Sequence, residues 1–280
     1  MECFSRREVF IIMETKTNQP MIINSLQVFP IKSLDRVLLP QVSITQGQAL
    51  EWDRRWAIHR KKDGRTVNGK KYPAVHQLRA TFDLENKQVR LQAPKQVQEQ
   101  FTLEGDLQEL NAYFSGYFGE AVEVLENTHR GFPDHTTGNV GASMVSVATL
   151  QQVGEWFNLP LEEVNKRMRM NIIVEGGAAF EEDALLSKSK EHSHSYWFGE
   201  AEVQTYKPCV RCPVPTRDTA TGEVIKGFQK KYMQQRLALQ PQLLEHPLYP
   251  HAYMCGLVLV IPPSSIGKTM QVGDEIVAKK

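Results

Sequence analysis

Alternation of apolar and polar residues runs through the first half of the chain and predicts strands there. In residues 81–84 and 88–91, apolar side chains recur at alternate positions on both sides of a short polar turn, which indicates a β-hairpin. The dipeptide Asp63-Gly64 follows the strand-like run 55–60 and predicts a second hairpin, because glycine tolerates a positive φ. The first half is therefore predicted to be rich in β-structure.

A helical period replaces this alternation near residue 107. Apolar side chains are then spaced three, four and three residues apart, and the spacing predicts a helix that ends at Gly119. The residues that set this period are Leu107, Leu110, Phe114 and Tyr117.

The second half mixes helices and strands. Thr149 is predicted to cap one helix, and Pro160 is predicted to open the next. A compact strand is expected at residues 170–174, before Gly176 and Gly177. Further strands are predicted at residues 201–206, 254–261 and 275–278, with a helix at 228–239.

These elements predict an α+β fold that is predominantly β. Repeats of 20–50 residues and regular β-α alternation are both absent from the sequence, which argues against a solenoid and a doubly wound sheet. Residues 127–141 are rich in Gly, Pro, Asn and Thr and predict a link or a long binding loop. We therefore predict a loose leader at 1–20, an N-terminal β-rich domain at 21–126 and a second domain at 127–280.

Composition narrows the classes of partner. Lys and Arg number 33 against 32 Asp and Glu, giving a formal charge of +1, so no global field favours nucleic acid or an anionic membrane. We expect no nucleic acid partner. No apolar stretch is long enough for a membrane span of about 20 residues. Four unevenly spaced cysteines favour a reducing, cytoplasmic location over a disulfide framework.

Charge is nevertheless concentrated locally. Residues 54–71 hold eight Lys and Arg against Asp63 alone, while residues 101–126 hold six acids and no base. The two segments are either paired with each other or serve separate roles. The basic run is either a solvated hairpin tip or an anion site built by arginine forks and lysine point charges.

The segment around Cys209 and Cys212 carries the most chemistry. A single C-x-x-C admits a zinc site, which would need ligands such as His192 and His194, a redox dithiol, or two buried thiols without a role. Pro213 and Pro215 disfavour the helix that a thioredoxin-like dithiol requires. Lys207, Arg211 and Arg217 are predicted to lower a thiol pKa, which favours a reactive or metal-binding thiolate without naming the metal.

Asp134 and His135 are a further candidate pair for acid–base chemistry. Asp134 and His135 are adjacent, and adjacent side chains on a strand point to opposite faces.

Three blocks in order resemble the MOSC superfamily, named for the C-terminal domain of molybdenum cofactor sulfurase, in its form with an N-terminal β-rich domain. They are Phe29-Pro30-Ile31-Lys32-Ser33-Leu34, then Arg167-Met168-Arg169-Met170-Asn171-Ile172-Ile173-Val174, then Pro208-Cys209-Val210-Arg211-Cys212 with Asp218. The resemblance covers residues 21–278. It implies a β-barrel-like second domain with peripheral helices.

The resemblance also implies a cofactor, the molybdenum-pyranopterin, and a set of site residues. Cys212 would supply the thiolate to molybdenum and would be both the metal ligand and the catalytic residue. The remaining residues that match cofactor-side positions are Lys32, Ser33, Arg54, Ser143, Arg169, Asn171 and Arg211. Ser143 is the weaker match among them.

Two departures from the family pattern concern the metal end. Val210 stands where the amidoxime-reducing members commonly have Ser, which removes one side-chain hydrogen bond near the metal. The polar stretch 188–195 resembles an insertion that alters substrate access.

The resemblance implies an oxidoreductase that reduces N-hydroxylated or related N–O small molecules. Four scattered cysteines and the lack of a G-x-G-x-x-G fingerprint predict that electrons come from a separate electron-transfer protein. The alternatives are a non-catalytic cofactor carrier, a sulfur-transfer protein, and a thiol- or zinc-dependent regulator.

Overall fold

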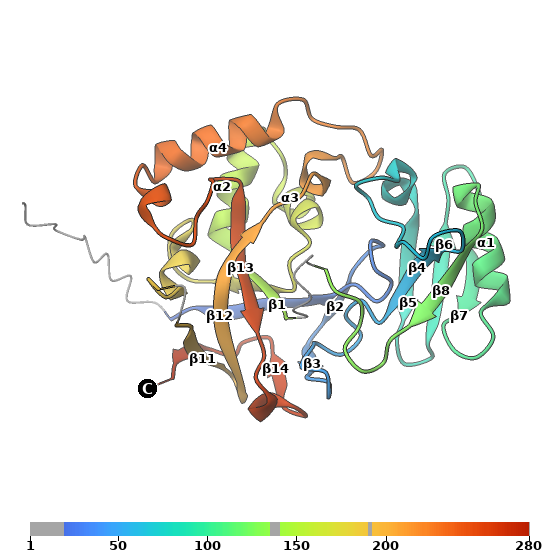
Figure 1. Ribbon diagram of the computed structural model, residues 1–280, viewed down its shortest axis with the longest axis horizontal. Coiled ribbons are helices and arrows are strands. Elements are labelled where there is room, and N and C mark those ends of the chain that lie inside the picture. Colours follow the sequence, from blue (N-terminus) through green and yellow to red (C-terminus); the bar gives the residue numbers. More distant parts are fainter. Residues whose placement is uncertain (1–19, 135–140, 190–191, 280) are drawn as a thin grey trace, which may run out of the picture.

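The computed structural model describes residues 20–134, 141–189 and 192–279, and its largest element is an eight-stranded sheet (Figure 1). In spatial order its strands are β15 (Ile276–Ala278), β11 (His194–Phe198), β12 (Ala201–Val210), β13 (Met254–Val260), β9 (Ser143–Ser146), β10 (Ile172–Glu175), β1 (Ile22–Val28) and β2 (Val37–Leu39). Neighbouring strands are antiparallel except β9 and β10, which are parallel.

Alternating side chains give this sheet two buried faces. On β10, Ile172 and Val174 face one hydrophobic cluster, and Ile173 faces another. The second cluster is covered by helices α2 (Val147–Phe157), α3 (Leu161–Met168) and α4 (Phe228–Leu239). A strand buried on both faces reads as an unbroken apolar run, which explains the compact pattern predicted at 170–174.

A smaller β-rich part lies beside the sheet (Figure 1). It contains the pair β4 (Trp56–Arg60) and β8 (Val122–Glu126), the meander β5 (Arg79–Asp83), β6 (Gln88–Gln92) and β7 (Glu99–Thr102), and helix α1 (Gln108–Phe118). Their apolar side chains form a separate cluster around Trp56 and Phe114, both fully buried. A last pair, β3 (Gln41–Ser43) and β14 (Thr269–Gln271), joins distant segments.

These elements confirm the predicted α+β class with predominant β-structure. The hairpin of β5 and β6, helix α1 with left-handed Gly119 at its end, and helix α4 all lie where the patterns placed them. The barrel that the resemblance implied is not closed by the strand pairing of the described residues. The edge strand β15 does approach the start of β1, the strand next to the other edge, because Ile23 N donates to Asp274 O at 2.9 Å and Ile276 N to Met21 O at 2.8 Å.

Two local predictions need correction. Ser146, not Thr149, caps α2, because the Ser146 side chain accepts from the Thr149 N–H. The turn at Asp63-Gly64 forms with Gly64 at φ +65°, but the segment after it makes only an isolated bridge between His59 and Thr66.

The strand pairing does not follow the predicted division of the chain into two domains. Strands β1 and β2 come from the predicted N-terminal domain, yet they extend the large sheet through pairing of β1 with β10. The predicted leader at 1–20 lies outside the described residues except for residue 20. The domain limits at 21–126 and 127–280 stay predictions. Among the described residues, no helix has both the length and the apolar character needed to cross a membrane.

Candidate functional site

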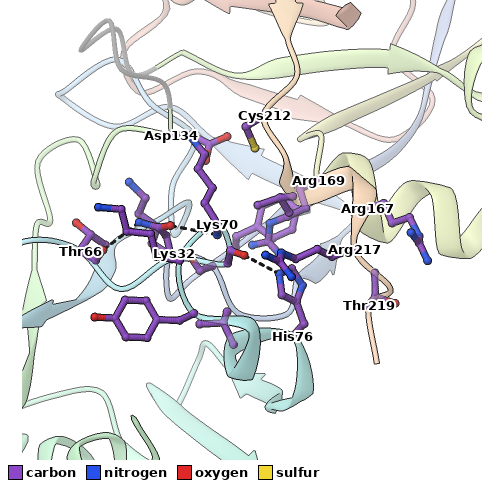
Figure 2. Close-up of a pocket in the computed structure, with 18 of the residues that line it drawn as sticks. Lys32, Thr66, Lys70, His76, Asp134, Arg167, Arg169, Cys212, Arg217 and Thr219 are labelled. Carbon is purple, nitrogen blue, oxygen red and sulfur yellow. Dashed lines mark hydrogen bonds between the residues drawn. The ribbon is translucent and has the colours of Figure 1, made fainter. Parts of the chain in front are cut away.

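A cavity of about 870 Å³ opens between the smaller β-rich part and the large sheet (Figure 2). One wall comes from residues 29–79 and the other mainly from residues 133–219. Its lining includes thirteen lysines and arginines against two aspartates, Asp35 and Asp134. The basic residues are Lys32, Arg36, Arg60, Arg65, Lys70, Lys71, Arg79, Lys166, Arg167, Arg169, Lys207, Arg211 and Arg217. The cavity is therefore strongly positive although the whole chain carries a charge of +1.

Some of these cations are neutralised in place. Arg36 pairs with Glu162 at 2.7 Å, and Arg79 pairs with Asp35 at 3.3 Å. Others in the smaller part pair with the acidic segment, as Arg60 does with Glu120 at 3.3 Å, so the two charged segments of the sequence do face each other in part.

Three other cations donate to main-chain carbonyl groups. Lys32 Nζ donates to Pro133 O at 2.6 Å, and Arg169 Nη2 donates to Leu34 O at 2.8 Å. Arg217 Nη1 donates to Gly222 O at 2.9 Å. A carbonyl orients a cation without cancelling its charge, so these side chains keep their attraction for an anion.

Cys212 lies on the wall of this cavity, in the loop that follows β12. Its side chain is half-buried, and Figure 2 shows its sulfur pointing into the cavity. Cys209 lies within β12 itself and is fully buried. The two cysteines therefore occupy different environments, and only Cys212 lies in the loop.

Burial raises the pKa of the Cys209 thiol, although the Arg211 guanidinium opposes the shift. The prediction that nearby cations lower the thiol pKa is wrong for Cys209, because desolvation of the thiolate outweighs the attraction of Arg211. Cys255, buried on β13, has its pKa raised to about 12 for the same reason.

Arg211 lines the cavity and ties the cysteine loop to the end of α3. Its Nη1 donates to Cys209 Sγ at 2.9 Å, and its Nη2 donates to Met168 O. Its pKa is raised: burial opposes the charge, but the neighbouring sulfurs, first that of Cys209, favour it. The buried Nε has no hydrogen-bond partner among the described residues, which leaves one donor for a ligand.

The Phe29 ring contacts two arginines that are predicted site residues, Arg54 and Arg169. The Arg169 guanidinium carbon is 4.2 Å from the Phe29 ring centroid, and that of Arg54 is 5.0 Å from it. Burial, and then the charge of Arg54, lower the pKa of Arg169 to about 10. Of the two, Arg54 is paired with Asp53 and Asp134, so Arg169 is the one that brings charge to the cavity wall.

Three of the predicted site residues adopt left-handed backbone conformations. The φ angles are 78° at Ser33, 52° at Arg54 and 52° at Arg169. Arg169 does so as the C-terminal cap of α3, where its N–H donates to Asn165 O. Non-glycine residues in this region cost on the order of 1 kcal/mol each, and such strain clusters at functional sites.

Asn171, Ser143 and Arg54 do not line the cavity. They are 1%, 3% and 4% exposed and form a buried network behind its wall. Asn171 Oδ1 accepts from Ser143 Oγ at 3.0 Å and from Arg54 Nη1 at 3.4 Å. Arg54 Nη2 in turn pairs with Asp134 on the cavity wall at 2.9 Å. The structure thus brings Lys32, Ser33, Arg169, Arg211 and Cys212 to the cavity, with these three residues supporting the wall.

Sequence reasoning missed several residues of the lining, such as His76 and Thr219 (Figure 2). Burial and the nearby arginines lower the pKa of His76, and its Nε2 lies 3.1 Å from Gly69 O. No motif marks His76, since it reaches the cavity only through folding of the smaller part. Lys70 and Lys71 also line the wall, and the basic run 54–71 was the feature that pointed to them.

The zinc alternative lacks a preformed site in the part of the chain that the structure describes. No group of three or more His, Cys, Asp or Glu side chains is arranged there to hold a metal ion. His192 and His194 are exposed. His135, the other half of the considered acid–base pair, lies outside the described residues.

The chain has two parts, and the cavity between them holds a thiol and several cations. Comparison with known protein families identifies the family to which such a chain belongs. A family model described as the MOSC domain matches residues 135–277, half of the chain. A second, described as the MOSC N-terminal beta barrel domain, matches residues 21–129. The chain belongs to the MOSC domain family.

Curated relatives resemble this chain over short segments. The molybdenum cofactor sulfurase of Emericella nidulans is 37% identical over 71 residues, covering 25% of this chain and 8% of that protein. The molybdenum cofactor sulfurase of Aspergillus terreus is 33% identical over 92 residues, covering 32% and 11%. The matches thus span only a small part of those proteins.

A solved structure, that of the YuaD protein from Bacillus subtilis, is similar with a TM-score of 0.39 at 12% identity, covering 92% of this chain and 94% of that chain. We draw no argument from so distant a likeness.

Proposed function

We propose that the protein binds the molybdenum cofactor and reduces N-hydroxylated or related N–O compounds, with electrons from a separate electron-transfer protein. The observation that carries the proposal is the half-buried Cys212 thiol on the wall of a basic cavity. A cysteine sulfur is a soft donor suited to a sulfur-ligated transition metal, and the cations suit a phosphate-bearing pterin.

The residues present fit this cofactor. Cys212 would supply the sulfur ligand, and Lys32, Ser33, Arg169 and Arg211 would hold the pterin and its phosphate. Lys32 and Arg169 are oriented by carbonyl groups and keep their charge, and Arg211 has an unpartnered Nε. Arg54, Asn171 and Ser143 would act as positioning residues behind them.

The reaction would break the N–O bond of the substrate, with the oxygen leaving as water and the nitrogen reduced. Two electrons would come from the electron-transfer protein and two protons from solvent, so atoms and charge balance. The bound cofactor would supply the two-electron redox step at the metal. The chain would hold the cofactor, orient the substrate and supply one sulfur ligand.

Catalysis requires that a substrate reach the metal, whereas the carrier and sulfur-transfer alternatives do not. The half-buried side chain of Cys212 on the cavity wall therefore favours catalysis. We keep the carrier as the second candidate, because the same cavity would hold the cofactor in transit. We also propose a cytoplasmic location from the cysteine content, and expect the N-terminal β-rich and MOSC domains at 21–126 and 127–280.

Activity assays separate the two candidates. Purified protein loaded with cofactor should reduce benzamidoxime when dithionite and a mediator dye supply electrons, whereas NADH alone should give no turnover. Full molybdenum loading without turnover under any electron donor would favour the carrier. Turnover driven by NADH in the isolated chain would contradict the need for a separate partner.

Cofactor anchoring is tested through pterin content. Lys32→Ala and Arg169→Ala should each leave a folded protein with much less pterin, because loss of one partner of a buried charged contact costs about 2–5 kcal/mol. Pterin fluorescence after oxidative release measures this. Lys226→Ala, which changes an exposed lysine outside the cavity, is the control. Unchanged pterin content in both cavity variants would contradict the assignment.

A further inference from the structure

The loop at residues 68–71 presents two lysines to the cavity and has no part in the cofactor site proposed above. Lys70 and Lys71 are exposed and line the wall. Neither forms an ion pair with a carboxylate among the described residues, whereas their neighbour Lys62 pairs with Glu120 at 2.7 Å. Glu120 of the acidic segment is therefore paired with another cation, and Lys70 and Lys71 have no carboxylate partner among the described residues.

The loop that carries them is held in one conformation. Asn68 Oδ1 accepts from Lys70 N at 3.1 Å, and Asn68 O accepts from Lys71 N at 3.1 Å. Gly69 is buried, and a Cβ at this position would lie 2.6 Å from His76 Nε2. A side chain at this position would require His76 to shift, so glycine favours the close packing of the loop on His76. The lysines therefore extend from a loop whose backbone is held by hydrogen bonds to Asn68.

Lys70 is also held near another cation. Figure 2 shows Lys70 beside Lys32, on the wall below Cys212. The pKa of Lys32 is lowered, chiefly by burial and in part by the charges of Arg54 and Lys70. Asp134 partly offsets this cluster, since its charge raises the pKa of Lys32, but cations outnumber acids on this wall, which favours an anion.

The cavity is large for a small-molecule site. Its volume of about 870 Å³ lies in the upper part of the range for small-molecule sites, about 300–1,000 Å³. Lys32, Arg169 and Arg211 are bonded and sit against the buried wall, as a resident cofactor requires. Lys70 and Lys71 are exposed, as a ligand that enters and leaves in each cycle requires.

We propose that the substrate of this site carries an anionic oxygen group, a carboxylate or a phosphate, and that Lys70 and Lys71 bind it. This inference rests on the proposed function for the identity of the reacting group. The lysines would act as specificity determinants that hold the anionic end of the substrate while its N–O group reaches the metal end near Cys212.

The test compares three compounds with the same reacting group: benzamidoxime, 4-carboxybenzamidoxime and 4-phosphonobenzamidoxime. Titration calorimetry on the cofactor-loaded protein should show at least one anionic compound binding about tenfold more tightly than the neutral one. The double variant Lys70→Ala/Lys71→Ala should lose this preference and keep the affinity for benzamidoxime. Whichever anion is preferred identifies the chemical source of the charge.

Lys226→Ala/Lys230→Ala removes the same charge from exposed positions outside the cavity and should keep the preference. Equal affinities in the wild type, no measurable binding of either anionic compound, or a preference that survives in Lys70→Ala/Lys71→Ala would overturn the inference. Turnover in the same samples separates the two proposals. Preference without turnover refutes only N–O reduction, and turnover without preference refutes only the anionic substrate.

Discussion

Asn171 joins the two halves of the chain through a single buried amide. Its Oδ1 accepts from Ser143 Oγ and Arg54 Nη1, and its Nδ2 donates to Gln27 O at 3.2 Å. Asn171→Ala would leave these buried groups without a partner. We expect it to lower the free energy of unfolding by about 2–4 kcal/mol, since each unsatisfied buried group costs about 1–3 kcal/mol.

Urea denaturation measures this, with Asn24→Ala as the matched control. Asn24 Nδ2 donates to Glu175 Oε2 at 3.0 Å on the exposed surface, so its loss should cost less than about 0.5 kcal/mol. Equal effects of the two substitutions would show that the buried network contributes nothing beyond a surface contact.

The sequence blocks pointed to residues such as Lys32, Arg169 and Cys212, and the structure brings these to the cavity. The same blocks did not distinguish Asn171, which lies behind the wall. Asn171 lies two residues after Arg169, whose left-handed backbone no spacing rule reveals at a non-glycine residue.

Glu182 binds the N-terminus of helix α2, although the two lie more than thirty residues apart in the sequence. Its side chain is fully buried and accepts from Ser146 Oγ and Thr149 Oγ1, each at 2.9 Å. Burial, and then the charge of Asp183, raises the pKa of Glu182 to about 7 from an ordinary value of 4.5. The folded protein therefore retains this proton at a pH where the unfolded chain has lost it.

The contribution of Glu182 to stability is consequently largest below about pH 4.5 and falls as the pH rises to 7. Relative to the wild type, Glu182→Gln should gain stability between pH 5 and pH 8, by roughly 3 kcal/mol at most. Urea unfolding of both proteins at several pH values measures the difference, in which groups common to both cancel. A difference that does not change with pH would contradict an ionising Glu182.

Helix α2 also shows where local patterns fall short. The apolar spacing placed the helix, but its cap is Ser146, because the helix begins at Val147 and Thr149 lies inside its first turn. Strand β12 runs to Val210, beyond the predicted end at 206, because pairing with β13 carries it through Pro208 across register shifts. Strong periodicity gave the type of each element, and tertiary contacts set its limits.

The charge of the whole chain conceals the charge of its cavity. Thirteen lining cations face two aspartates, while the protein carries a formal charge of +1. We expect uptake of the anionic cofactor by cofactor-free protein to slow by roughly tenfold between 0.1 and 1 M salt, as the screening length falls from about 10 to about 3 Å.

Pterin bound after fixed times of mixing measures this rate. The control is the free energy of unfolding over the same salt range, which checks that the protein stays folded. A rate that does not depend on salt would show that the cavity field has no part in cofactor capture.

The cavity itself was beyond prediction from the sequence. Its walls come from segments more than a hundred residues apart, as the hydrogen bond from Lys32 to Pro133 illustrates. Strand β1 reaches this position through pairing with β10, a long-range contact that no local pattern encodes. The alternation of apolar residues did predict which faces of the strands are buried, and so most of the core.

The central claim is that Cys212 binds molybdenum, and X-ray absorption at the molybdenum edge tests it most directly. Compared with the wild type, Cys212→Ser should lose one sulfur neighbour of the metal while pterin is retained. Cys209→Ser should keep the sulfur count, because the buried Cys209 contacts Arg211 within the sheet. An unchanged sulfur count in Cys212→Ser, or zinc in place of molybdenum in the wild type, would contradict the account.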